Sequence, residues 1–91
     1  MMNIHLGEYV YSSAGHDSGK CYVIVSVCGN YVYLCNGKGR KVCSPKKKKI
    51  RHIVPTGRVS ELFENKETGY MPTNKEIRYS IGNYLKEISD N

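Results

Sequence analysis

The sequence has no long hydrophobic run. No apolar stretch is longer than five residues, as in Cys21–Val25, whereas a helix that crosses a bilayer needs roughly 20. Residues 1–8 also lack the apolar core and the small-residue cleavage site of a secretory signal. We therefore expect a soluble cytoplasmic protein with no membrane partner, and in that compartment the cysteines should be reduced thiols.

Acidic side chains are scarce in the first two thirds of the chain. The 91 residues hold 14 Lys and Arg against 8 Asp and Glu, for a net charge of +6. Residues 1–58 hold ten basic and two acidic side chains (net +8), and residues 59–91 hold four and six (net −2). Such a basic excess favours an anionic partner, with nucleic acid first and a membrane surface second. The length suffices for one domain, and the hydrophobic content of 40% is that of a globular protein.

The four cysteines lack the spacing of a structural zinc site. They stand at positions 21, 28, 35 and 43, whereas such sites usually pair their ligands as Cys-x2–4-Cys. Cys21, Cys28 and Cys35 fall inside or beside β-type runs, where cysteine serves as a small apolar residue. We expect four free thiols, no metal and no cofactor.

The chain also lacks a recognisable catalytic arrangement. His5, His16 and His52 are scattered, and His16 and Asp17 have no Ser or Cys nucleophile in a recognisable elbow beside them. Adjacent His and Asp residues make no relay unless folding orients them toward a third group. We therefore expect a protein that is not an enzyme and that has no small-molecule substrate.

Short β-type runs separated by turn signals fill residues 4–55. The expected strands are residues 6–12, 21–27, 31–35 and 40–43, with 50–54 as a fifth candidate that ends at Pro55. Asn36-Gly37 is the strongest short hairpin signal and suits a type I′ turn between the third and fourth strands. Strands of this number and spacing predict a small barrel or sandwich.

Helical periodicity replaces this pattern in the last third of the chain. Val59, Leu62 and Phe63 suggest a short helix, and residues 73–76 match a capping box. The apolar positions that follow form one stripe of an amphipathic helix, namely Ile77, Ile81, Tyr84, Leu85 and Ile88. Because an isolated helix of this length is marginal in water, we expect the stripe to pack on the barrel or on a neighbouring subunit.

The segment from Gly7 to Lys20 is the first candidate for binding. Gly15 and Gly19 permit positive φ and a close approach of the backbone to another molecule. The order of its residues resembles the KOW motif of ribosomal and transcription-elongation proteins: Gly7, Val10, a loop of small residues, Gly19-Lys20 and the apolar strand Val23–Val25. More narrowly, the chain resembles small bacterial RNA-binding proteins that are related to a family of archaeal and eukaryotic large-subunit ribosomal proteins.

This resemblance implies a fold and a partner. The expected fold is mainly β, with a small SH3-like (KOW) barrel over residues 1–56 and a short helical C-terminal extension over residues 57–91. The expected partner is RNA, in particular structured ribosomal RNA. His16 departs from the family, whose loop usually has Arg there, and an unperturbed His is mostly uncharged at neutral pH. Asn36 stands where the family usually has Asp, and both suit the predicted turn.

A basic cluster is the second candidate for binding. Its members are Lys38, Arg40, Lys41, Lys46, Lys47, Lys48, Lys49, Arg51 and His52. We expect the lysine run to lie just outside a strand, to fan over one rim of the barrel and to contact phosphates. The guanidinium groups of Arg40 and Arg51 suit bidentate phosphate contacts or stacking on a base. With Gly15, His16, Gly19 and Lys20, the cluster forms the predicted RNA-binding site; the alternative is a charged, solvated surface.

Tyrosines on the expected strands leave a second function open. Tyr31 or Tyr33 could stack on an unpaired base, although burial against the C-terminal helix is the alternative for each. Some KOW barrels dock on proteins through such strands, so a module that binds ribosomal or transcription proteins is the second hypothesis. The lysine run favours RNA, because a protein-docking barrel does not need it.

Overall fold

The computed structural model describes residues 4–15, 18–63 and 71–89. Within these ranges the chain forms the strands β1 (Glu8–Ser12), β2 (Cys21–Cys28), β3 (Tyr31–Cys35), β4 (Lys46–Lys49) and β5 (Ile53–Val59). Two single 3-10 turns, η2 (Ile50–His52) and η3 (Glu61–Phe63), and one helix, α1 (Asn74–Ser89), complete the described elements. The predicted mainly β fold with a helical C-terminal tail is confirmed.

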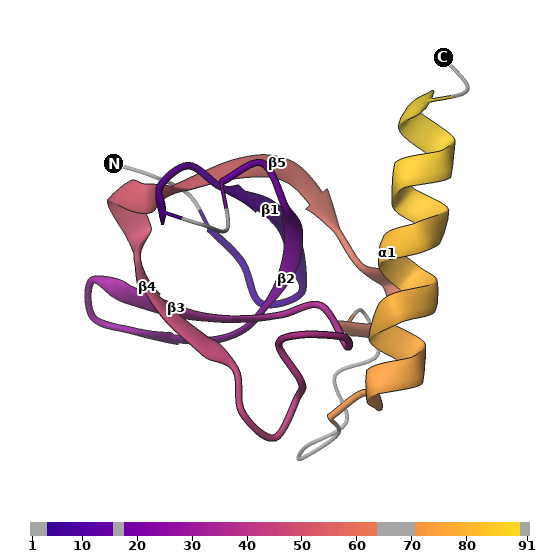
Figure 1. Ribbon diagram of the computed structural model, residues 1–91, viewed down its shortest axis with the longest axis horizontal. Coiled ribbons are helices and arrows are strands. Elements are labelled where there is room, and N and C mark those ends of the chain that lie inside the picture. Colours follow the sequence, from indigo (N-terminus) through magenta and orange to yellow (C-terminus); the bar gives the residue numbers. More distant parts are fainter. Residues whose placement is uncertain (1–3, 16–17, 64–70, 90–91) are drawn as a thin grey trace.

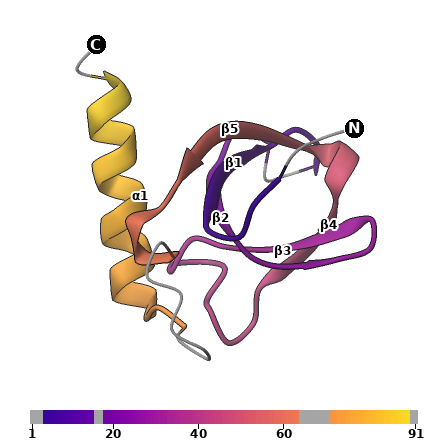
Figure 2. The same cartoon turned by 180° about the vertical axis from the view of Figure 1, so that it is seen from behind.

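The strands form one antiparallel sheet in the order β4-β3-β2-β1-β5. The sheet curls into a small barrel, and α1 lies against its outside (Figure 1). Figure 2 shows the same arrangement from behind, with the helix beside the wall that β1 and β2 build. Within the described ranges, no helix is both long and apolar enough to cross a membrane.

Two apolar clusters hold the fold together, one on each face of the sheet. Successive side chains of a strand point to opposite faces, so a strand such as β2 can contribute to both clusters. The cluster inside the barrel consists of Val10, Tyr22, Ile24, Val32, Leu34 and Ile53. The cluster between the barrel and the helix consists of Tyr9, Cys21, Val23, Val25, Cys35, Ile77, Ile81 and Tyr84. The period-2 pattern therefore places apolar residues on both faces, because α1 covers the outer one.

The helix begins with the capping box that the sequence predicts. The backbone N–H of Thr73 donates to Glu76 Oε1 at 2.9 Å, and the N–H of Glu76 donates to Thr73 Oγ1 at 3.1 Å. Ile77 and Ile81 of the predicted stripe are buried, and the ring of Tyr84 stacks on that of Tyr9 at 4.3 Å between centroids. The stripe thus packs on the barrel as predicted, except at its C-terminal end, where Leu85 and Ile88 are each 39% exposed.

The prediction that the lysine run lies just outside a strand is wrong, because the run itself forms strand β4. It pairs with β3 from Tyr31–Lys49 to Leu34–Lys46. The strand predicted over residues 40–43 is wrong, since those residues belong to the loop between β3 and β4. Lysine has a low intrinsic preference for strands, but pairing along β3 at the end of the sheet outweighs it.

The last strand starts later and ends later than predicted. Residues 50–52 form the turn η2, and β5 then continues past residue 56, the expected end of the barrel, to Val59. Pro55 does not end the strand because β5 is an edge strand of the sheet, where a missing N–H is tolerated. Of the helix suggested near Leu62, the described residues contain the turn η3, which ends at Phe63, the last described residue before position 71.

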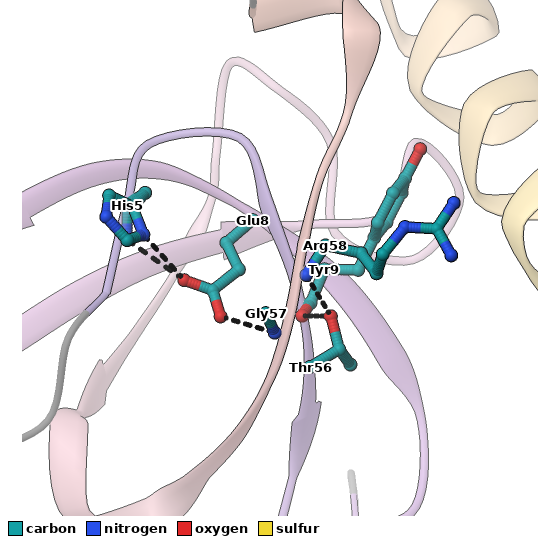
Figure 3. Close-up of polar contacts among 6 residues, drawn as sticks. All are labelled: His5, Glu8, Tyr9, Thr56, Gly57 and Arg58. Atoms are coloured by element: carbon teal, nitrogen blue, oxygen red, sulfur yellow. Dashed lines mark hydrogen bonds and ion pairs between the residues drawn. The ribbon is translucent and has the colours of Figure 1, made fainter.

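A buried carboxylate stabilises an irregularity where β1 pairs with β5. Glu8 pairs with Val59, but Val10 pairs with Pro55, so β5 bulges between these two positions. Glu8 is fully buried there; its Oε1 accepts the N–H of His5 and its Oε2 accepts the N–H of Gly57, both at 3.0 Å (Figure 3). Within the bulge, the side chain therefore gives the N–H of Gly57 the acceptor that the regular ladder does not supply, and it also joins the chain before β1 to β5.

The packing divides the four thiols into two that should react rapidly and two that should react slowly. Cys28 and Cys43 are exposed, whereas Cys21 and Cys35 are buried, and burial raises the pKa of each buried thiol to about 11. Because the thiolate is the reactive form, a maleimide should label only Cys28 and Cys43 rapidly in the native protein and all four after unfolding. Peptide mass spectrometry measures the labelling. Equally fast native labelling of Cys21 or Cys35 would contradict the packing.

Candidate nucleic-acid interface

Three basic residues from two separate segments surround one open cavity. The cavity has a volume of about 530 Å³ and is lined by Lys20, Tyr22, Asn36, Lys38, Gly39 and Arg40. Lys20 immediately precedes β2, and Lys38 and Arg40 belong to the loop between β3 and β4. The fold thus brings cations from distant parts of the sequence to one cavity, an arrangement that suits an anionic group.

Asn36 shapes the loop that carries two of these cations. Its side-chain Oδ1 accepts the backbone N–H groups of Lys38 and Arg40 at 3.0 and 3.1 Å. The predicted type I′ turn is wrong, because it needs positive φ at both central residues and, among the described residues, only glycines have it. Gly37 does, at φ 77°, so Asn36-Gly37 begins a longer loop instead of a tight hairpin.

The first turns of α1 hold the same loop from the other side. The Arg78 guanidinium donates to the carbonyl oxygen of Gly37 at 2.7 Å, and Asn74 Oδ1 accepts the N–H of Val42 at 2.7 Å. A Cβ atom at Gly37 would lie 2.3 Å from the carbonyl oxygen of Asn74, so only glycine fits against the helix there. The helix therefore positions the loop that bears Lys38 and Arg40.

The glycine-containing loop between β1 and β2 adjoins the lysine strand. Lys48 Nζ donates to the carbonyl oxygen of Ala14 at 2.7 Å, and the N–H of Ser13 donates to the carbonyl oxygen of His52 at 2.9 Å. Gly15 and Gly19 are exposed and have φ of 77° and 86°, a region of backbone conformation that favours glycine. His16 lies outside the described residues.

Lys48 connects the glycine loop with the basic cavity. Desolvation lowers the pKa of Lys48, and the positive charges of Lys46 and Arg40 lower it further. Arg40 lines the cavity, so these charges act on one another across the boundary between cavity and strand. The three cations of the cavity and the two lysines whose charges act together with that of Arg40 are here called the basic surface: Lys20, Lys38, Arg40, Lys46 and Lys48.

The lysine run does not fan over one rim, because alternate residues of a strand point to opposite faces. Lys46 and Lys48 pair with Leu34 and Val32 and share the face of those residues, whereas Lys47 and Lys49 share the outer face with Tyr33 and Tyr31. Lys46 and Lys48 are also half-buried, and Lys47 and Lys49 are exposed. Only two of the four lysines therefore join the basic surface.

The tyrosines proposed for stacking on RNA are both half-buried. Tyr33 packs beside the cluster under α1, and Lys47 Nζ lies 4.4 Å from the centroid of the Tyr31 ring, within cation–π range. Tyr22 is buried beneath the cavity, and burial raises its pKa although Arg40 acts in the opposite direction. The cavity thus presents cations and backbone groups to a ligand rather than an exposed ring.

The remaining predicted site residues lie around this surface. Lys41 is exposed in the turn after Arg40 and does not line the cavity, and Arg51 and His52 belong to η2, beside the glycine loop. Sequence reasoning missed Asn36 and Arg78 as residues that hold the basic loop. The Asn-Gly pair signalled a turn at Asn36, but no local pattern indicated that Arg78 reaches it.

The described residues contain no group of three or more His, Cys, Asp or Glu side chains that could hold a metal ion. In comparisons with known proteins, no protein-family model matches the chain, and no curated protein is significantly similar to it.

Proposed function

We propose that the protein is a cytoplasmic RNA-binding module of the KOW type that holds structured RNA by its phosphates and carries out no catalysis. The observation that carries the proposal is the convergence of Lys20, Lys38 and Arg40 around one cavity, beside Lys46 and Lys48. Ribosomal RNA is the proposed ligand, in line with the resemblance of residues 7–25 to the KOW motif.

The chemistry of the cavity favours contacts to the RNA backbone over base recognition. Sequence-specific readout needs exposed rings or unoccupied hydrogen-bonding groups. Tyr22 is buried, and Asn36 Oδ1 already accepts two backbone N–H groups. Cations on a curved surface instead match phosphates, whose contacts fix position and carry no sequence information. We therefore expect similar affinities for structured RNAs of different sequence.

A docking site for ribosomal or transcription proteins is the second candidate function. It is favoured by Leu85 and Ile88, which remain 39% exposed at the end of α1. Nuclease treatment of a cell lysate separates the two candidates. If the protein binds RNA, it should leave the ribosomal and RNA-bound fractions after digestion. If it docks on a protein, it should stay in those fractions.

Two adjacent residues provide a matched test of the RNA proposal. Arg40→Gln and Lys41→Gln each remove one exposed positive charge, but only Arg40 lines the cavity. Arg40→Gln should weaken binding to a structured RNA fragment about five- to tenfold and flatten the log–log salt dependence by about 0.7–0.9, the contribution of one phosphate contact. Lys41→Gln should bind like the wild type. A salt titration by fluorescence anisotropy measures both, and equal losses for the two variants would refute a role for the cavity.

A further inference from the structure

The solvent-facing side of α1 is basic, although the C-terminal third of the chain has a net charge of −2. Residues three, four, seven and eleven positions apart lie on one side of a helix with about 3.6 residues per turn. The exposed residues that share this side are Lys75, Arg78, Tyr79, Gly82 and Lys86, here called the helix face. The opposite side bears Ile77, Ile81 and Tyr84, which are buried against the barrel.

The acidic residues of α1 are kept away from the helix face. Within Asn74–Ser89 these are Glu76 and Glu87, which share the adjoining side of the helix. Glu76 accepts the N–H of Thr73 in the capping box, and Glu87 accepts the guanidinium of Arg58 at 2.7 Å. The helix face therefore presents cations and neutral groups, which suit a polyanion.

Tyr79 stands out among the tyrosines. It is 73% exposed, whereas the other tyrosines that the structure describes are buried or half-buried. It lies one helical turn after Lys75 and two turns before Lys86, on the same side of the helix, so its ring and these two cations are available to the same ligand. An exposed ring among cations is the arrangement on which an unpaired base stacks while its phosphates bind the neighbouring charges.

Gly82 leaves the middle of the helix face open. Apart from the backbone of the helix itself, a Cβ atom there would have no atom within 4 Å, so no packing contact requires glycine at this position. Glycine costs a helix up to about 1 kcal/mol relative to alanine. A missing side chain between Tyr79 and Lys86 instead allows a ligand backbone to approach the helix closely.

The helix face is continuous with the basic surface. The Arg78 guanidinium donates to the carbonyl oxygen of Gly37, and the next residue along the chain, Lys38, lines the cavity. From Lys75 to Lys86 the face extends about 17 Å along the helix axis, at 1.5 Å per residue. One flexible strand can therefore pass from the cavity across Arg78 and along the helix.

We infer that the RNA held by the basic surface extends as a single strand along the helix face, where an unpaired base stacks on Tyr79 and phosphates bind Lys75 and Lys86. This inference rests on the proposed RNA binding and adds a requirement for unpaired nucleotides. It predicts that an RNA stem with a single-stranded tail binds more tightly than the same stem without the tail.

Gly82 allows a test that cannot fail through unfolding. Gly82→Glu, Gly82→Gln and Gly82→Lys all place a better helix former in open space, so each variant should fold at least as well as the wild type. For the tailed stem, Gly82→Glu should weaken binding about fivefold, Gly82→Lys should strengthen it, and Gly82→Gln should change it least. For the blunt stem, all three should bind nearly alike.

A second pair of variants tests the stacked base. Tyr79→Ala should weaken binding of the tailed stem about tenfold, within the range measured for one base on an aromatic side chain, whereas Tyr79→Phe should keep most of the affinity. If the wild type binds both stems equally and the variants at positions 79 and 82 match it, the inference is wrong and the proposed function stands. If the wild type binds neither stem, both are wrong. If the affinity for an acidic protein changes with the charge at position 82 while the affinity for RNA does not, the helix face serves a protein partner instead.

Discussion

Glu8→Ala should lower the free energy of unfolding by about 2–4 kcal/mol, a large part of the total of about 5–14 kcal/mol expected for a domain of this size. The carboxylate accepts the N–H groups of His5 and Gly57 and thereby joins the chain before β1 to the bulge of β5 (Figure 3). Alanine leaves both donors without this acceptor and opens a cavity at a fully buried position.

Glu8→Gln is the matched control for this prediction. It has nearly the same shape and keeps one carbonyl oxygen, but its amide places a donor against one of the two N–H groups. We therefore expect it to lose about half as much stability as Glu8→Ala. Urea unfolding followed by circular dichroism gives both values. An unchanged midpoint for Glu8→Ala would show that the carboxylate does not stabilise the bulge.

Replacing Lys46 and Lys48 with glutamine should weaken RNA binding about 10- to 100-fold, because two cations of the basic surface are lost together. The salt dependence should flatten by about 1.4–1.8, twice the contribution of one phosphate contact. Lys48 also donates to the carbonyl oxygen of Ala14, so its removal releases the glycine loop from β4. Affinity should fall for RNAs of different sequence alike, since the contacts are to phosphates.

The double variant Lys47→Gln/Lys49→Gln is the control for this second prediction. It lowers the net charge of the chain from +6 to +4, as the first variant does, but on the other face of the same strand. We expect it to lose less than about threefold in affinity, through long-range electrostatics alone. Melting temperatures of both variants verify the fold. Equal losses would mean that RNA responds to the total charge of the strand and not to one face of it.

Local patterns were sufficient to predict the elements whose residues bear their own signals. Thr73 and Glu76 form the capping box within four consecutive residues, and the stripe from Ile77 follows from the helical period alone. The run Cys21–Val25 is rich in β-branched residues and forms part of β2 as expected. In each case the sequence preference and the observed structure agree, because tertiary contacts reinforce the local choice.

Other features depend on contacts between distant segments and could not be predicted in this way. Nothing in four consecutive lysines indicates a strand, and the choice is made by the pairing with Tyr31–Leu34. The loop after Asn36 takes its form from Asn74 and Arg78, which are about forty residues away in the sequence. The sequence therefore indicates the residue types of the candidate site, but the division of the lysines between two faces depends on the pairing of β4 with β3.

The position of β4 at the end of the sheet also affects self-association of the protein. An edge strand presents unpaired backbone groups to which a strand of a second molecule could add, and natural proteins protect such edges with lysine or proline. The sheet has lysines on β4 at one end and Pro55 on β5 at the other. A second β4 alongside the first would bring two rows of positive charge within one strand spacing, about 4.8 Å. The charges that suit β4 to a polyanion thus also oppose edge-to-edge self-association.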